Sequence, residues 1–228
     1  MSESELVNTA REIVASTFVS MALQVPGTQF EEREQFWMVS GTSSLSICNF
    51  AIKFDLSEEP EQVVEGMVRR SKSMPAFSVF SATGDKPENS ERLWVENGFQ
   101  VRQILTTFVS ESALDGERTE LAVCETKEDR LRIADFMVEQ FFLRVSDPQK
   151  QAIALALASS PHGLHFSEDG FGVASAAMRV ETAKGAALYN LCVRSDRRSQ
   201  GEGSKIVREF STWCADPVSY THLRAHET

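Results

Sequence analysis

The sequence predicts an α/β fold of two modules, in each of which helices flank a mixed, mostly antiparallel sheet. Three observations lead to this prediction. Helical and β-type apolar spacings alternate along the 228 residues. A polar stretch, Ser112–Arg118, interrupts the alternation near the middle, and the order of elements restarts after it. We therefore expect a first module at residues 1–113 and a second at 117–217.

A helix opens the first module. Apolar residues from Leu6 to Met21 recur at three- and four-residue spacing, which predicts an amphipathic helix over about residues 3–23, before Pro26 and Gly27. β-favouring segments, polar turns and further helical patterns follow. In chain order we expect strands at 36–40 and 45–54, a helix at 61–73, a strand at 76–82, a helix at 90–97 and a strand at 99–110.

The second module repeats the alternation. Asp147 followed by Pro148 indicates the cap and the first position of a helix. The pair Asp169-Gly170 is typical of a hairpin turn, and we expect Asp169 to be solvated there. In chain order we expect a strand at 120–124, helices at about 126–142 and 147–159, strands at 163–167, 172–181 and 186–194, and a helix at 204–214.

Charge and composition exclude several classes of protein. Lys and Arg number 23 against 33 Asp and Glu, so the net charge is −10 and there is no basic block for nucleic acid. No apolar run approaches the ~20 residues of a membrane span. Residues 1–10 lack the order of a signal peptide, so we expect a cytoplasmic protein. The 4 cysteines have no C-x-x-C spacing, which indicates reduced, buried thiols.

The end of the chain differs in texture from the rest. Residues 218–228, VSYTHLRAHET, have no helical periodicity and contain two of the 4 histidines. The string resembles a transposon-based sequencing-library adapter translated in one frame, so we interpret it as a non-native tail; the alternative is a genuine polar tail. On the first interpretation the gene is interrupted near Asp216, the second module is truncated, and we expect little turnover from the chain as written.

A loop with two glycines follows the strand expected at 186–194. Gly201 and Gly203 let the backbone approach a ligand closely and leave amide N–H groups available at the start of the next helix. Such a helix start attracts phosphate, and Arg197 and Arg198 add positive charge. The pattern predicts a pyrophosphate site, with a purely structural turn as the alternative. Its spacing is neither that of a dinucleotide fingerprint nor that of a P-loop.

The same segment resembles a known family. Arg198-x-x-Gly201-x-Gly203, after a strand containing N-L-C-V and before an amphipathic helix, is similar to the acyl-CoA-binding motif of the GNAT superfamily of N-acetyltransferases. The order of elements over residues 117–216 is also that of the family. The resemblance implies acetyl-CoA as co-substrate, no metal, and an amine of a small molecule or peptide as acceptor.

The resemblance also implies which residues bind acetyl-CoA. Leu191, Cys192 and Val193 would lend backbone groups to the pantetheine and acetyl arm. Glu202 departs from the family pattern, in which an apolar or neutral residue usually lies between the glycines. A carboxylate near a pyrophosphate repels it unless the carboxylate faces solvent or pairs with an arginine. The residues that would wrap the pyrophosphate are Arg198, Ser199, Gln200, Gly201, Glu202, Gly203 and Ser204.

The sequence assigns no catalytic acid or base. Tyr189 and Asn190 lie nearest the expected acetyl group, but a strand tyrosine is typical of packing. We interpret Cys192 as a buried thiol, and His162 and His165, without a third ligand, as loop polarity. The expected reaction is direct attack of the amine on the thioester. A non-catalytic module that binds CoA or a partner, and a loop for another phosphate ligand such as a nucleotide, are the alternatives.

The chain also contains an internal similarity. A shift of 141 residues places Cys48–Asp55 on Tyr189–Asp196 without a gap, and Asn49 then meets Asn190. The first module therefore resembles the second. Its counterpart of the glycine loop, Leu56–Glu61, holds three carboxylates and neither glycine nor arginine. We expect this first module to be degenerate and to bind no CoA.

Overall fold

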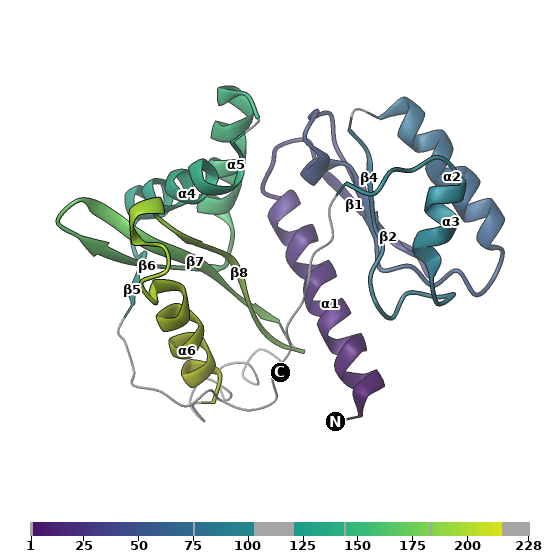
Figure 1. Cartoon of the computed structure of the whole chain (residues 1–228). Coiled ribbons are helices and arrows are strands. Elements are labelled where there is room, and N and C mark those ends of the chain that lie inside the picture. Colours follow the sequence, from purple (N-terminus) through teal and green to yellow (C-terminus); the bar gives the residue numbers. More distant parts are fainter. Residues whose placement is uncertain (1, 75, 103–120, 144, 183, 216–228) are drawn as a thin grey trace, which may run out of the picture. The chain divides into compact units, whose positions relative to one another are not determined.

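The structure, a computed structural model, describes residues 2–74, 76–102, 121–143, 145–182 and 184–215. The chain has an α/β fold and divides into two compact units, Met1–Val109 and Ser110–Thr228, each with a four-stranded sheet (Figure 1). The expected boundary at residues 114–116 lies outside the described residues.

The sheet of the first unit is mixed. Its strands lie in the order β1-β2-β3-β4, with β1–β2 and β2–β3 antiparallel and β3–β4 parallel. A parallel pair needs a crossover connection, which α2 supplies. The elements are α1 (Glu3–Ala22), β1 (Gln29–Glu32), β2 (Trp37–Ser40), the 3₁₀ turn η1 (Ser46–Cys48), β3 (Phe50–Ile52), α2 (Pro60–Ser73), β4 (Ser78–Phe80) and α3 (Ser90–Glu96).

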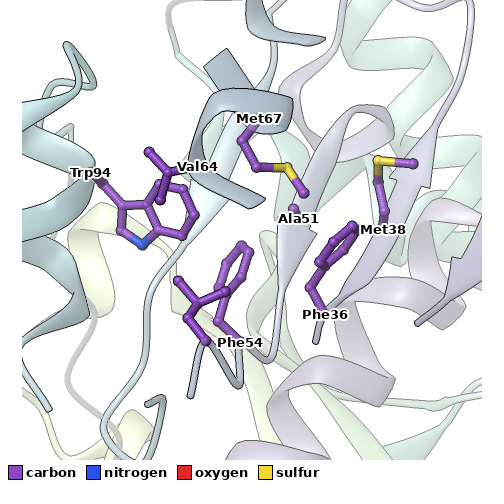
Figure 2. Packing of buried hydrophobic residues seen from close by; sticks show 8 residues of the cluster. Phe36, Met38, Ala51, Phe54, Val64, Met67 and Trp94 are labelled. Carbon is purple, nitrogen blue, oxygen red and sulfur yellow. The ribbon is translucent and has the colours of Figure 1, made fainter. Parts of the chain in front are cut away.

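Helices cover both faces of this sheet. Neighbouring strand residues point to opposite faces, so β2 and β3 each contribute to two apolar clusters. The cluster that includes α1 consists of Ala15, Val19, Ala22, Val39, Phe50 and Ile52. The cluster that includes α2 and α3 consists of Phe36, Met38, Ala51, Phe54, Leu56, Val64, Met67 and Trp94 (Figure 2).

The sheet of the second unit is antiparallel throughout, in the order β5-β6-β7-β8. Two helices separate the first strand from the hairpins, and one follows the last strand. The elements are β5 (Ala122–Val123), α4 (Lys127–Phe141), α5 (Asp147–Ser159), β6 (Gly163–Asp169), β7 (Gly172–Thr182), β8 (Gly185–Val193), the 3₁₀ turn η2 (Ser195–Arg197) and α6 (Glu202–Ala215).

Helices α4 and α6 pack on opposite faces of this sheet. Arg132 of α4 lies over the Phe166 ring of β6, with its Cζ 5.3 Å from the ring centroid. Arg179 of β7 lies over the Trp213 ring of α6, with its Cζ 4.0 Å from the ring centroid. Arg179 pairs with Gly163, three residues from Phe166, so Arg179 and Phe166 point to different faces. Because α6 follows β8 after a short loop, the start of α6 lies near the end of β8.

The helices of the first unit confirm their predictions to within one residue at each end. The strands do so less well. β1 was not predicted, and the strand predicted at 45–54 is shortened to Phe50–Ile52 by the 3₁₀ turn that precedes it. Residues 99–102 are not in a strand, and the rest of the strand predicted at 99–110 lies outside the described residues.

Two helix starts in the second unit also differ from prediction. Ser146, not Asp147, caps α5; the side chain of Gln149 accepts a hydrogen bond from Ser146 N at 3.2 Å. Asp147 is the first helical residue, where its charge favours the helix dipole. Helix α6 begins at Glu202, two residues before the predicted start, so Glu202 and Gly203 belong to its first turn.

The two units match in register around their last shared strand and helix. With the shift of 141 residues, β3 falls on residues 191–193, which are the end of β8. Helices α2 and α6 are both 14 residues long, and the same shift places α2 on residues 201–214, one residue from α6. The internal repeat stays a prediction, but its register extends through the helix.

Candidate functional site

Strand β8 carries a bulge near its carboxyl end. Cys192 pairs with Ala176 and Tyr189 pairs with Met178, so Asn190 and Leu191 together lie opposite a single residue. Asn190 has a φ of 51°, in the left-handed region. A bulge removes backbone N–H and C=O groups from the hydrogen-bond ladder between strands. At this bulge, beside the predicted residues Leu191, Cys192 and Val193, such groups can bind a ligand instead.

The loop between β8 and α6, residues 194–201, reverses the chain in a short distance. Ser199 has a φ of 62° and Gly201 a φ of 86°. Only glycine adopts such an angle without strain, so Gly201 is required by the backbone and Ser199 holds local strain. At Gly203, by contrast, a Cβ would meet Val193 Cγ2 at 3.8 Å, an ordinary contact.

The first turn of α6 begins directly after this loop. Lys205 N donates to Gly201 O at 3.0 Å, and this bond closes the first turn. The N–H groups of Glu202, Gly203 and Ser204 precede it, and the first N–H groups of any helix have no carbonyl partner within that helix. Together with the helix dipole they favour an anion at this end.

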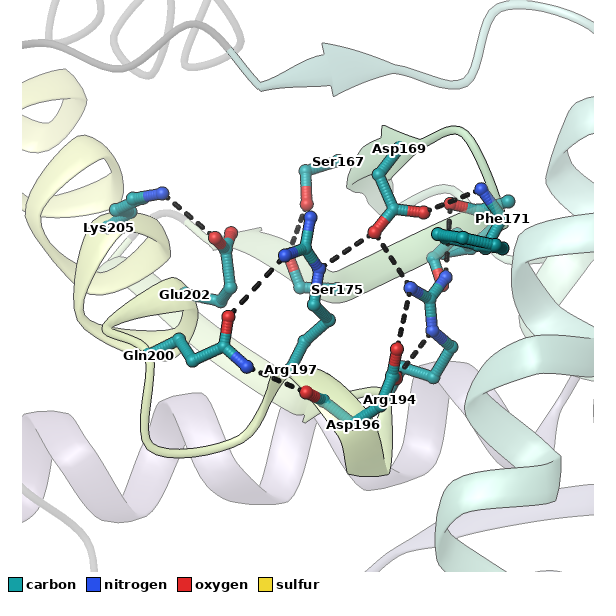
Figure 3. Close-up of polar contacts among 12 residues, drawn as sticks. Ser167, Asp169, Phe171, Ser175, Arg194, Asp196, Arg197, Gln200, Glu202 and Lys205 are labelled. Carbon is teal, nitrogen blue, oxygen red and sulfur yellow. Dashed lines mark hydrogen bonds and ion pairs between the residues drawn. The ribbon is translucent and has the colours of Figure 1, made fainter.

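Two arginines of the loop are held by one carboxylate (Figure 3). Asp169, at the end of β6, accepts from Arg194 Nη2 and from Arg197 Nε, each at 2.7 Å, and from Phe171 N at 2.9 Å. These bonds, led by the one from Arg194, lower the pKa of Asp169 to about 2. The expectation of a merely solvated Asp169 is therefore wrong, and the charge of Arg197 is already partnered.

The two other charged residues at the predicted pyrophosphate site also have partners, neutral oxygens for Arg198 and a lysine for Glu202. Arg198 Nε donates to Val193 O at 3.1 Å, and its Nη2 donates to Gln140 Oε1 of α4 at 3.2 Å. Glu202 pairs with Lys205 Nζ at 2.8 Å, not with an arginine. The carboxylate of Glu202 therefore has its own counter-charge three residues further along α6.

The thiol of Cys192 is not a nucleophile in this arrangement. Its side chain is buried, and Sγ lies 3.6 Å from Ala176 O. Burial raises the pKa of Cys192 to about 12, so the reactive thiolate is absent at physiological pH. The interpretation of Cys192 as a packed thiol is confirmed.

The two histidines expected to be polar loop residues differ in position: His162 precedes β6 and is buried, and His165 is a half-buried residue of that strand. His165 lies in β6, and burial, with a smaller effect of Arg179, lowers the pKa of His165 to about 4. Burial also lowers the pKa of His162, which is 8% exposed. In the part of the chain that the structure describes, no group of three or more His, Cys, Asp or Glu side chains could hold a metal ion.

The first unit carries its own anion at the corresponding position. Phe54 follows β3 as Ser195 follows β8 in the repeat, and Phe54 N donates to Asp85 Oδ1 at 3.0 Å. Ala82 N and Arg11 Nε donate to the same carboxylate, at 2.9 and 2.7 Å. An internal carboxylate thus accepts from the backbone just after β3, at the position that the repeat equates with Ser195, two residues beyond the predicted site residue Val193.

Comparison with protein-family models, with curated proteins and with solved structures found no match to this chain. No helix among the described residues has both the length and the apolar character needed to cross a bilayer. Residues 218–228, interpreted as a non-native tail, lie outside the described residues.

Proposed function

We propose that the second unit is an acetyl-CoA-dependent N-acetyltransferase module, with an amine of a small molecule or peptide as acceptor. One observation carries the proposal: the bulge at Asn190 and Leu191 is followed, within a loop of eight residues (194–201), by the start of α6. The bulge offers backbone groups to an extended acyl arm, and the helix start offers N–H groups to a diphosphate. Both parts of an acyl-CoA therefore find complementary main-chain groups along one continuous path.

The proposed reaction is a direct transfer. The acceptor nitrogen attacks the thioester carbonyl, the C–S bond breaks, and the products are an amide and the free thiol of CoA. The amine proton passes to water, directly or through a base, and the departing thiolate takes a proton from water. Because the pKa of Cys192 is raised to about 12, an acyl-enzyme on that thiol is disfavoured. Catalysis rests on alignment and on backbone N–H groups near the developing oxyanion.

Binding of CoA to the 228-residue chain tests the proposal. The expected result is a calorimetric titration with CoA that the substitution Gly201→Asp abolishes, because it adds a negative charge at the start of α6. Gly201→Ala separates charge from backbone strain, since both variants keep the positive φ of 86°. Gly66→Asp in α2, where a Cβ meets nothing within 4 Å, carries the same change of net charge in the first unit.

The affinities of the wild type and the variants for CoA decide whether the proposal holds. The proposal requires that Gly66→Asp binds CoA as the wild type does and that Gly201→Asp does not. Acetyl transfer is then followed as release of free thiol from acetyl-CoA with a panel of amines. If the wild type and Gly201→Asp give the same titration, or neither binds at millimolar CoA, the acetyltransferase proposal is wrong.

A second candidate is a module that binds CoA or a partner without catalysis. The pairing of charges around the loop favours it, because the cations that could stabilise a diphosphate already have carboxylate partners: Asp169 pairs with Arg194 and Arg197, Asp196 with Arg194, and Glu202 with Lys205. Release of thiol with any amine of the panel would support the enzyme over this candidate.

A further inference from the structure

We propose that Asp169 is a positioning residue for the ligand site: it fixes the 194–201 loop through Arg197 and so sets the backbone that receives the anion. The inference rests on the proposed function for the identity of the ligand. Asp169 is the last residue of β6, 25 residues before Arg194 in the sequence, and its side chain is only 14% exposed. It is thus a partly buried anchor from another element.

A chain of contacts runs from Asp169 across the loop. Arg197 Nε donates to Asp169 Oδ2 at 2.7 Å, and Arg197 Nη1 donates to Gln200 Oε1 at 3.4 Å. Gln200 Nε2 in turn donates to Asp196 O at 2.7 Å. The path joins the end of β6 to Gln200 and Asp196, which lie near the two ends of the loop (Figure 3).

The loop needs such an anchor because it is strained. Ser199 holds a φ of 62°, which a residue with a side chain adopts only when its surroundings enforce it. Gln200, next to Ser199, is the residue that Arg197 contacts. Loss of the carboxylate would release Arg197, then Gln200, and let Ser199 relax to a common conformation that moves the start of α6.

The charge of Asp169 alone would have the opposite effect on an anionic ligand. A carboxylate near a diphosphate repels it, so simple removal of the negative charge should strengthen binding. Removal of an anchor should weaken binding, because the amides are no longer held in place. The two roles therefore predict changes of opposite sign when Asp169 is replaced by an isosteric amide.

The experiment compares Asp169→Asn with Glu168→Gln in the 228-residue chain by titration with CoA. Glu168 is the adjacent carboxylate and forms an ion pair with Arg132 of α4 instead of with the loop. Both variants change the net charge by the same amount. We expect Asp169→Asn to weaken CoA binding about tenfold, the scale on which residues that orient ligand groups act, and Glu168→Gln to leave it unchanged. Unchanged or tighter binding by Asp169→Asn overturns the inference.

Three further measurements separate positioning from a general loss of fold. Asp169→Glu, which keeps the carboxylate, should recover part of the affinity. The loss in the double variant Asp169→Asn with Arg197→Gln should be smaller than the sum of the two single losses, because the carboxylate acts in part through that arginine; fully additive losses overturn the inference. Amide hydrogen exchange of residues 198–201 in the ligand-free chain should accelerate in Asp169→Asn and not in Glu168→Gln.

The hydrogen-exchange measurement also distinguishes failure of the proposed function from failure of the positioning role of Asp169. If the wild type binds no CoA, the proposed function fails, yet faster exchange in Asp169→Asn still supports the positioning of the loop. If exchange at residues 198–201 is the same in both variants, the positioning inference fails whatever the wild type binds.

Discussion

Asp85 Oδ1 lies 2.7 Å from Arg11 Nε, and this ion pair ties α1 to the connection between β4 and α3 in the first unit. The Asp85 side chain is fully buried and that of Arg11 is 13% exposed. The carboxylate also accepts from Ala82 N and from Phe54 N. A single buried anion therefore joins the first helix, the end of β3 and the segment after β4.

Loss of this carboxylate should destabilise the first unit strongly. Asp85→Ala leaves the Arg11 charge partly buried without its partner, which costs about 3–5 kcal/mol. Urea unfolding followed by the fluorescence of the first unit, which holds Trp37 and Trp94, measures the free energy of unfolding. Lys86→Ala is the control, because its pair with Asp55 is exposed and should contribute no more than about 1 kcal/mol. Equal losses in the two variants would contradict this account of Asp85.

Stability of the second unit should rise between about pH 4 and pH 6.5. Burial lowers the pKa of His165 to about 4 from its ordinary 6.5, so the unfolded chain binds the proton first as pH falls through this window. The difference between the two pKa values corresponds to about 3 kcal/mol. Urea midpoints at pH 4.5 and 7.5 measure it. His165→Gln should flatten the dependence, although buried His162 retains a smaller share; an unchanged slope in His165→Gln would count against this assignment.

The two glycines of the predicted motif should respond differently to alanine. Gly201→Ala forces a side chain into a φ of 86° and should destabilise the second unit by about 1 kcal/mol. Gly203→Ala places a helix-favouring residue in the first turn of α6 with ordinary contacts, so it should be neutral or stabilising by up to about 1 kcal/mol. Urea unfolding of the two variants measures both, and equal losses would contradict the position of the helix start at Glu202.

The elements that could be predicted are those whose signal is local. The apolar spacing of α1 and Pro60 at the start of α2 predict both helices to within one residue. Strand β1 could not be predicted, because Gln29–Glu32 holds one apolar residue and is an edge strand with mostly exposed side chains. A strand without an apolar face carries no alternation for the sequence to display.

The candidate site also has a part that local sequence signals predict and a part that they do not. The glycine and arginine spacing after β8 was visible in the sequence, and it indicated the loop and a helix start. The partners of those arginines were not visible, because Asp169 reaches Arg194 and Arg197 only through the pairing of β6 with β7 and of β7 with β8. The hairpin-turn signal at Asp169-Gly170 was the one clue that this carboxylate lies at a strand end.

Thiol reactivity should single out Cys214. Cys48, Cys124 and Cys192 are buried, whereas Cys214 is exposed. We expect one thiol of the native chain to react with a disulfide reagent at pH 8 and all 4 to react in urea. Since desolvation raises the pKa of Cys214 to about 11, the native reaction should be slow and should accelerate as the pH rises toward 10.

Cys214→Ser is the control for this assignment, and it should remove the native reaction without altering the three thiols exposed by urea. The comparison bears on mechanism as well, because an enzyme that acylated Cys192 would need that thiol to be accessible and ionised. Native labelling of Cys192 in the Cys214→Ser variant, identified by peptide mass, would contradict both its burial and the direct transfer proposed for the second unit.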